Sequence, residues 1–156
     1  MAGTGIESTR DSIMERLKTW PNLLGVKIFD EMVTDSEQVP MKDGFVLPYA
    51  AVVFGARGRV ANKYRGIVGS RFDSKNLYFG VECYAGTPGL KRTLADHVFE
   101  ALEGFEPDNA GEISSSYSGS IENPATVQQN SVRYGIGLTF DCMVNIEMPD
   151  AVQSIG

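Results

Sequence analysis

The stretch that decides the fold runs from Tyr134 to Ile146 and reads YGIGLTFDCMVNI. Apolar side chains occupy every second position, seven in all, and the positions between them are mostly small or polar. This period predicts one long strand with one buried face. At about 3.4 Å per residue such a strand is more than about 40 Å long. It can therefore extend beyond its own domain and pair with a neighbouring subunit. Gly135 and Gly137 permit a bend or a bulge near its start.

Three further strands are expected upstream of this run. Pro48 opens the continuous apolar stretch Tyr49 to Phe54, which predicts a central strand buried on both faces or at an oligomer contact. Residues Asn76 to Tyr84 place apolar side chains at alternate positions and predict a strand with one buried face. A short strand is expected at Gly25 to Phe29, with valine and isoleucine on one face and lysine and phenylalanine on the other.

Two helices are predicted. The first covers Ser8 to Trp20 and ends at Pro21. The second starts with Thr87 as its N-cap and Pro88 at its first position, and Gly104 supplies a left-handed residue at its end. The apolar rows are Ile13, Met14, Leu17 and Trp20 in the first helix and Leu90, Leu94, Val98 and Leu102 in the second. The charged residues expected on the other face of the second helix are Lys91, Arg92, Asp96, Glu100 and Glu103.

Together these elements indicate an α+β fold, a mostly antiparallel sheet with two helices packed on one face. The chain is expected to form a single domain, 1–156, with residues 1–5 and 148–156 as flexible tails. Residues 30–43 are expected to form an acidic loop without the spacing of a calcium site. The serine-rich stretch 112–119 is a candidate edge strand, and residues 121–130 are expected to be irregular.

Positive charge is concentrated in one segment between two predicted strands. This segment, residues 57–75, holds six of the fourteen basic residues and only one acid, while the whole chain has a net charge of −6. We call it the basic segment, and its basic residues are Arg57, Arg59, Lys63, Arg65, Arg71 and Lys75. A long basic connection of this kind is a solvated loop, an assembly surface or a nucleic-acid contact. The acidic isoelectric point of about 4.8 argues against a general nucleic-acid binder.

Motifs for catalysis or cofactor binding do not occur in the sequence. His97 is the only histidine and has no patterned nucleophile, so we expect a residue on the helix surface. Cys83 and Cys142 lie in strand-like runs and are expected to be buried thiols of a reducing compartment, with a disulfide only if their strands face each other closely. We therefore expect no catalytic residues, no cofactor and no metal. Neither a membrane-spanning run nor an N-terminal signal core is present in this sequence.

Four stretches in order carry a resemblance to a known family. They are LLGVKIFD at Leu23 to Asp30, Leu47 to Tyr49 before an apolar strand, LKRTLADHVFEALEGF at Leu90 to Phe105, and RYGIGLTF at Arg133 to Phe140. In this order the chain resembles the tail terminator (minor tail) proteins of long-tailed bacteriophages, especially those of actinobacterial phages. The likeness covers roughly residues 6–146.

The resemblance implies a structural virion protein and not an enzyme. Such proteins form a hexameric ring on the tail tube, end tube polymerisation and provide the surface for head joining. The implied partners are other copies of the chain, the tail tube protein and the head–tail connector or neck proteins, with no membrane, and with genome DNA only passing through the lumen. The implied location is the top of the tail, after assembly in the host cytoplasm.

Under this interpretation the basic segment is an assembly face for an acidic neighbour. The alternative is a nucleic-acid-binding α+β domain that uses residues 57–75. A small enzyme is a third possibility, and it requires a pocket of converging titratable groups that the sequence does not predict.

Overall fold

The computed structural model describes residues 6–31, 39–59, 72–115, 121–128 and 131–147. The helices are α1 (Ile6–Thr19), the 3₁₀ turn η1 (Pro21–Leu23) and α2 (Pro88–Leu102). The strands are β1 (Lys27–Asp30), β2 (Met41–Lys42), β3 (Phe45–Val46), β4 (Tyr49–Arg59), β5 (Phe72–Ala85), β6 (Ser114–Ser115), β7 (Ile121–Gln128) and β8 (Ser131–Glu147).

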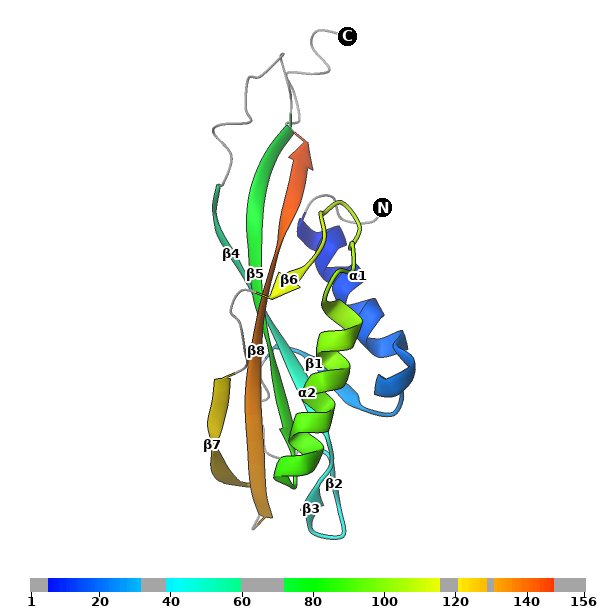
Figure 1. Cartoon of the computed structure of the whole chain (residues 1–156), viewed down its shortest axis with the longest axis vertical. Coiled ribbons are helices and arrows are strands. Elements are labelled where there is room, and N and C mark those ends of the chain that lie inside the picture. The colour runs from blue at the N-terminus through cyan, green and yellow to red at the C-terminus, as the bar shows by residue number, and fades with distance from the viewer. Residues whose placement is uncertain (1–5, 32–38, 60–71, 116–120, 129–130, 148–156) are drawn as a thin grey trace, which may run out of the picture.

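Six strands form one sheet in the order β1-β4-β5-β8-β6, and β7 also pairs with β8. Only the β1–β4 pair is parallel; the other pairs in this sheet are antiparallel. The two helices lie on the same side of the long strands (Figure 1). The predicted α+β fold, a mostly antiparallel sheet with two helices on one face, is therefore confirmed.

The long strand predicted from the period-two run is β8. Its side chains at 136, 138, 140, 142 and 144 are at most 8 % exposed and pack under the helices, whereas Tyr134 is half-buried. Along β5 and β8, Leu77 lies opposite Cys142 and Cys83 lies opposite Ile136. The two cysteines are therefore about six residues apart along the ladder, roughly 20 Å, and are free thiols without a disulfide.

The second helix begins as predicted and buries a slightly different face. Thr87 accepts a hydrogen bond from the Leu90 backbone nitrogen at 3.1 Å, as an N-cap does, and Gly104 has φ +82°. Leu90, however, is 48 % exposed and Lys91 only 4 %. Leu90 was expected on the buried face and Lys91 on the exposed face, and both expectations were wrong. The buried stripe of α2 follows positions 91, 95, 98 and 102, so the first turn of the helix places residue 91 against the core.

A second, smaller core lies on the opposite face of the sheet. Val39, Val46, Tyr49 and Tyr84 are buried there, with Phe29 and Met41 packed beside them. This cluster explains why β4 starts as a continuous apolar run: residues 49–52 are at most 1 % exposed, since both faces are covered. Phe29 also points away from Val26 and Ile28, which pack on the main core, as the alternation in the short strand predicted.

The expectation of an irregular stretch at 121–130 was wrong. Residues Ile121–Gln128 form β7, which pairs with the start of β8. The register shifts between Asn123 and Thr126, and Pro124 lies inside this shift. A proline has no amide hydrogen for a ladder, so it is accommodated at an irregularity of an outer strand. The serine-rich edge strand is present only as the two residues of β6.

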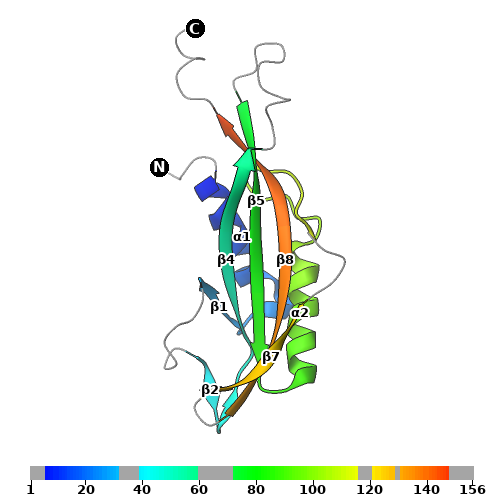
Figure 2. The ribbon, with the colours of Figure 1, turned by 90° about the vertical axis from the view of Figure 1, so that its left-hand side faces the viewer.

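The long strands give the molecule two distinct ends (Figure 2). At the upper end, β4 finishes and β5 begins; at the lower end lie β2, β3, the start of α2 and the start of β8 (Figure 1). No helix among the described residues is long and apolar enough to cross a membrane. The expected flexible tails, 1–5 and 148–156, lie outside the described residues.

Candidate assembly surfaces

The upper end carries part of the basic segment. Arg57 and Arg59 lie on β4, and Lys75 lies on β5 opposite Arg59, next to a shift in the register. Lys63, Arg65 and Arg71 lie outside the described residues. The structure therefore brings three of the six predicted interface residues to one end of the β4–β5 ladder. The basic segment is continuous with two paired strands, as a hairpin-like connection requires.

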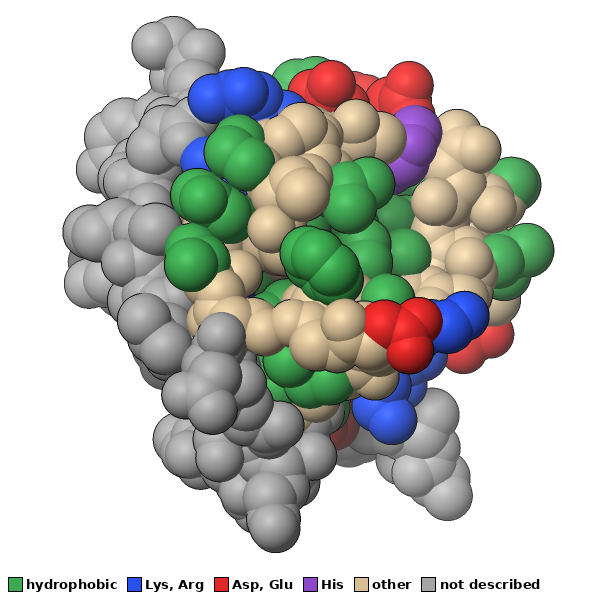
Figure 3. Space-filling view, turned by 90° about the horizontal axis from the view of Figure 1, so that it is seen from below, with side chains coloured by type: hydrophobic (Ala, Val, Ile, Leu, Met, Phe, Trp, Pro, Cys, Tyr) green, Lys and Arg blue, Asp and Glu red, His purple; other side chains and the backbone are tan. Residues whose placement is uncertain are grey.

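The lower end exposes apolar side chains. Six large apolar residues are notably exposed in the described part of the chain, and four of them lie in or directly beside the elements at this end. We call these four the apolar end: Phe45 (63 % exposed), Leu47 (38 %), Leu90 (48 %) and Val132 (44 %). Seen from below, hydrophobic side chains are spread over this surface between polar ones (Figure 3). A gathering of exposed apolar groups at one end is typical of a protein–protein contact.

Backbone contacts hold the elements of the apolar end together. A Cβ atom added to Gly86 would lie 2.8 Å from the Val46 carbonyl oxygen, so only glycine permits this approach of the α2 entry to β3. The Ser131 hydroxyl donates to the Gly44 carbonyl and joins β8 to the β2–β3 turn. The apolar end is therefore built on anchored elements and is not a loose loop.

A cluster of tyrosines and one arginine ties β4, β5 and β8 together. The Arg133 Nη1 atom donates to the Tyr49 hydroxyl at 2.7 Å, and the guanidinium carbon lies 4.4 Å from the centre of the Tyr84 ring. The Tyr49 and Tyr84 rings stack at 5.1 Å. Burial, together with the neighbouring Glu82 carboxylate, raises the pKa of Tyr84 to about 12, although the Arg133 guanidinium acts in the opposite direction. Because both rings are nearly inaccessible, this cluster stabilises the sheet and offers no catalytic group.

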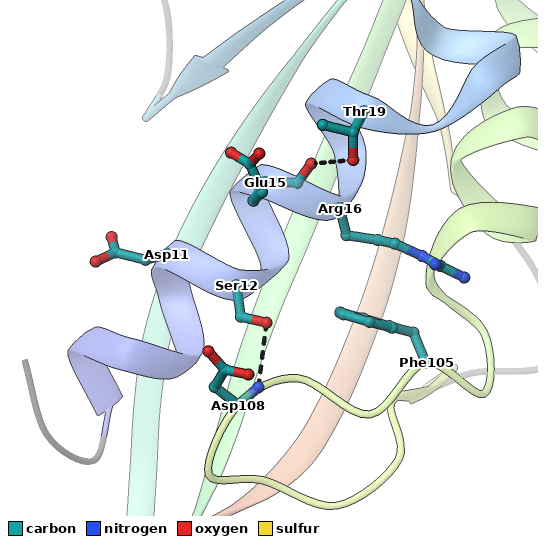
Figure 4. A pocket seen from close by; sticks show the side chains of 7 residues that line it. All are labelled: Asp11, Ser12, Glu15, Arg16, Thr19, Phe105 and Asp108. Atoms are coloured by element: carbon teal, nitrogen blue, oxygen red, sulfur yellow. Dashed lines mark hydrogen bonds between the residues drawn. The ribbon is translucent and has the colours of Figure 1, made fainter. Parts of the chain in front are cut away.

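A groove of about 510 Å³ lies between α1 and the segment that follows α2. Its lining residues are Asp11, Ser12, Glu15, Arg16, Thr19, Phe105 and Asp108, and we call it the α1 groove (Figure 4). The lining carries three carboxylates against one guanidinium, a net charge of −2. The two acids of α1 are one helical turn apart, and both are exposed.

Fixed contacts shape this groove. The Asp108 backbone nitrogen donates to the Ser12 hydroxyl at 3.1 Å, and the Thr9 hydroxyl donates to the Asp108 carbonyl at 2.8 Å. The Arg16 Nε atom donates to the Ala101 carbonyl at 2.8 Å. These bonds dock the end of α2 and the segment after it onto α1, so the groove is a preformed feature of the fold.

The guanidinium of Arg16 closes one side of the groove. Its carbon lies 4.4 Å from the Trp20 ring centre and 4.5 Å from the Phe105 ring centre. A cation held between two aromatic rings and bonded to a carbonyl is fixed in position. The acids on the α1 groove therefore remain available for a positive partner from outside.

Candidate catalytic groups are not assembled in the described residues. His97 is half-buried on α2, with its Nδ1 atom 3.2 Å from a Glu100 carboxylate oxygen. Burial raises the pKa of the Cys83 thiol and raises that of Cys142 to about 12, so both stay protonated and weakly nucleophilic. The part of the chain that the structure describes contains no group of three metal-ligating side chains of the His, Cys, Asp or Glu type.

Sequence reasoning missed the apolar end and the α1 groove. Both depend on elements distant in the sequence: β3, α2 and β8 for the first, and α1 with the segment around Phe105 and Asp108 for the second. The only local signal for the groove is the i, i+4 pair Asp11 and Glu15, a spacing common on solvated helices. Neither surface has a sequence motif.

Comparisons with known proteins add a fold likeness. No family model matches the chain, and no curated protein matches it. Among solved structures, a similar chain belongs to a structure described as the virion of a native gene transfer agent (GTA) particle. The two chains are 13 % identical, with a TM-score of 0.60 over 89 % of this chain and 96 % of the other. At this identity the likeness establishes a shared fold.

Proposed function

We propose that this chain is a structural protein of a phage-like virion and acts as a tail terminator, a hexameric ring that ends the tail tube and provides the surface for head joining. One observation supports the virion part of the proposal: the fold of nearly the whole chain matches nearly the whole of a chain from a gene transfer agent virion. The finer role, that of a tail terminator, rests on the resemblance of the sequence. The order of the four sequence stretches quoted above points to the same class of protein.

The molecule has the unlike surfaces that such a role needs. A ring closes through heterologous contacts, in which two different faces of each copy meet. A junction protein must also touch one assembly on one side and a second assembly on the other. We call the end of the β4–β5 ladder that carries Arg57, Arg59 and Lys75 the basic end. It and the apolar end lie at opposite ends of the long strands (Figure 1), and they differ in chemistry. We assign the apolar end to a contact with another virion protein, because exposed phenylalanine and leucine favour burial.

This proposal includes no catalysis and no cofactor. Two observations support the absence of catalysis from this proposal. The buried thiols are held protonated, and among the described residues the side chain of His97 contacts a neighbouring carboxylate. The partners that we propose are other copies of the chain, the tail tube protein and a head–tail connector or neck protein. The location that we propose is the top of the tail.

The competing function is nucleic-acid binding by the basic segment. In our proposal the genome only passes through the lumen, so tight binding to phosphates would hinder its passage. We expect double-stranded DNA to bind weakly to the purified chain in 50 mM salt. Two results together would favour the alternative. The wild-type chain would bind DNA and lose that binding when Arg57, Arg59, Lys63 and Arg65 are replaced by alanine, and the chain would have no effect on tail assembly.

The decisive test measures mass and position. The full chain should form a particle of six times 17.0 kDa, alone or on added tail tubes, and particles should stop tube growth in electron micrographs. Phe45→Ser should weaken attachment either to tail tubes or to the connector without unfolding the chain, since this side chain is 63 % exposed. Leu24→Ser is the matched control, because Leu24 is 66 % exposed and lies outside the apolar end. A chain that remains a monomer on tubes would refute the proposal.

A further inference from the structure

The proposed ring needs a specific contact between neighbouring copies, and one described surface fits the basic segment. Resting on the proposed function, we propose that the α1 groove of one copy receives the basic segment of the next copy. The α1 groove and the basic segment are then the two surfaces that meet between neighbouring copies in the ring. The occupant is a second copy of this chain, recognised through its arginine and lysine side chains.

Charge complementarity is the first reason. The basic segment carries six basic residues and one acid, a net charge of +5 in a chain of −6. The α1 groove carries the opposite sign, from Asp11, Glu15 and Asp108, and all three residues are exposed. Opposite patches on two faces of one chain steer copies head to tail, while like patches repel each other. The single cation of the groove, Arg16, is bound to a carbonyl and two rings.

The shape of the groove is the second reason. It has room for side chains, at about 510 Å³, and Phe105 places an aromatic ring in its wall (Figure 4). Guanidinium groups bind carboxylates through paired hydrogen bonds, so the carboxylates around this groove suit arginine side chains from a neighbouring copy. The hydrogen bonds of Asp108 with Ser12 and Thr9 fix the wall before any partner arrives, so little ordering is needed on binding.

Reach is the third reason. The two sides of the contact lie on different parts of the molecule: the groove is on the helix side, and the basic segment leaves the sheet at the end of the β4–β5 ladder. The twelve residues 60–71 join these strands. Half of this number, six residues, spans at most about 20 Å when fully extended. A segment of this length is therefore long enough to project beyond the strands of its own copy.

The test uses two variants with reversed charge. The segment variant R57E/R59E/K63E/R65E changes the basic segment from a net charge of +5 to −3, and the groove variant D11K/E15K changes the groove from −2 to +2. Each variant alone places like charges on both sides of the contact. We expect association to weaken at least roughly tenfold in each, with wild-type association falling as salt screens the charges.

Mixing the two variants is the critical step. In an alternating ring, the reversed segment of one copy meets the reversed groove of the next, and the unaltered segment meets the unaltered groove. We therefore expect the equimolar mixture to regain the mass of six subunits. A mixture that stays dissociated would overturn the inference, because it would mean that the segment occupies the groove of its own copy or another surface. Assembly of either variant alone at the wild-type concentration would overturn it as well.

Two controls separate the possible failures. The variant D96K/E100K carries the same charge change on an exposed i, i+4 pair of α2, and should assemble like the wild type. Circular dichroism and thermal unfolding should show that all variants fold, since the altered residues of the groove are exposed on α1. A wild-type chain that never forms six subunits would refute the proposed function itself, before any variant is compared.

Discussion

Replacing Phe140 with alanine should destabilise the protein strongly without touching a proposed interface. Phe140 is 1 % exposed in the middle of β8, and its ring lies 5.5 Å from that of Phe79 and 6.3 Å from that of Phe99. Truncating a buried phenylalanine to alanine costs about 3–5 kcal/mol through lost burial and the cavity that remains. Domains of this kind have a total stability of about 5–15 kcal/mol, so the variant should still fold if the wild type lies above the low end of this range.

The expected shift in melting temperature follows from the chain length. For a domain of 150–250 residues, 1 kcal/mol lowers Tm by about 2–4 °C. A loss of about 4 kcal/mol should therefore lower Tm by roughly 8–16 °C in thermal unfolding followed by circular dichroism. Leu24→Ala is the exposed control: Leu24 is 66 % exposed and lies outside the apolar end, and such surface changes usually stay within about 0.5 kcal/mol. If both variants melt alike, the assignment of the buried face of β8 is wrong.

Three smaller predictions concern the cap and the titratable groups. Thr87→Ala should cost about 1 kcal/mol and lower Tm by about 2–4 °C, because α2 loses its N-cap bond; Thr87→Ser should keep most of the stability, and an unchanged Tm in the alanine variant would contradict the cap. Cys83 and Cys142 should react with an aromatic disulfide reagent at pH 8 only in denaturant, and fast labelling of the native chain would contradict their burial. The pKa of the Tyr84 hydroxyl is near 10 in the unfolded chain and about 12 in the native one, so between these pH values the native state holds a proton that the unfolded state has lost. The free energy of unfolding from urea titrations should therefore fall from pH 10 to 12. An equal fall with pH in the Tyr84→Phe variant would exclude this cause.

The elements with a strong local period were predictable from the sequence. The alternation in β8 identified its buried face because one side of an antiparallel sheet faces a core. Thr87, Pro88 and Gly104 marked the ends of α2 because each satisfies a local backbone requirement of a helix end. These signals depend on neighbours within a few residues, and the sequence contains all of them.

The features that the sequence did not predict depend on distant contacts. β7 has a proline and few apolar residues, and it becomes a strand because β8 supplies the ladder and a register shift accommodates Pro124. Lys91 has a charged side chain, yet it is buried because the helix packs on the face that contains it. The α1 groove exists only after the segment with Asp108 docks on α1, and no pattern within either segment reports that docking.

The length of the β5–β8 ladder has a mechanical consequence. Fourteen consecutive residues of β5, from Phe72 to Ala85, pair with β8, and the ladder runs between the two ends of the molecule. Tension applied along this direction, with one end held and the other pulled, loads these backbone bonds in shear, so many must break at once. Pulling across the strands would instead open them one after another. The subunit is therefore stiffest along the line that joins its basic end to its apolar end.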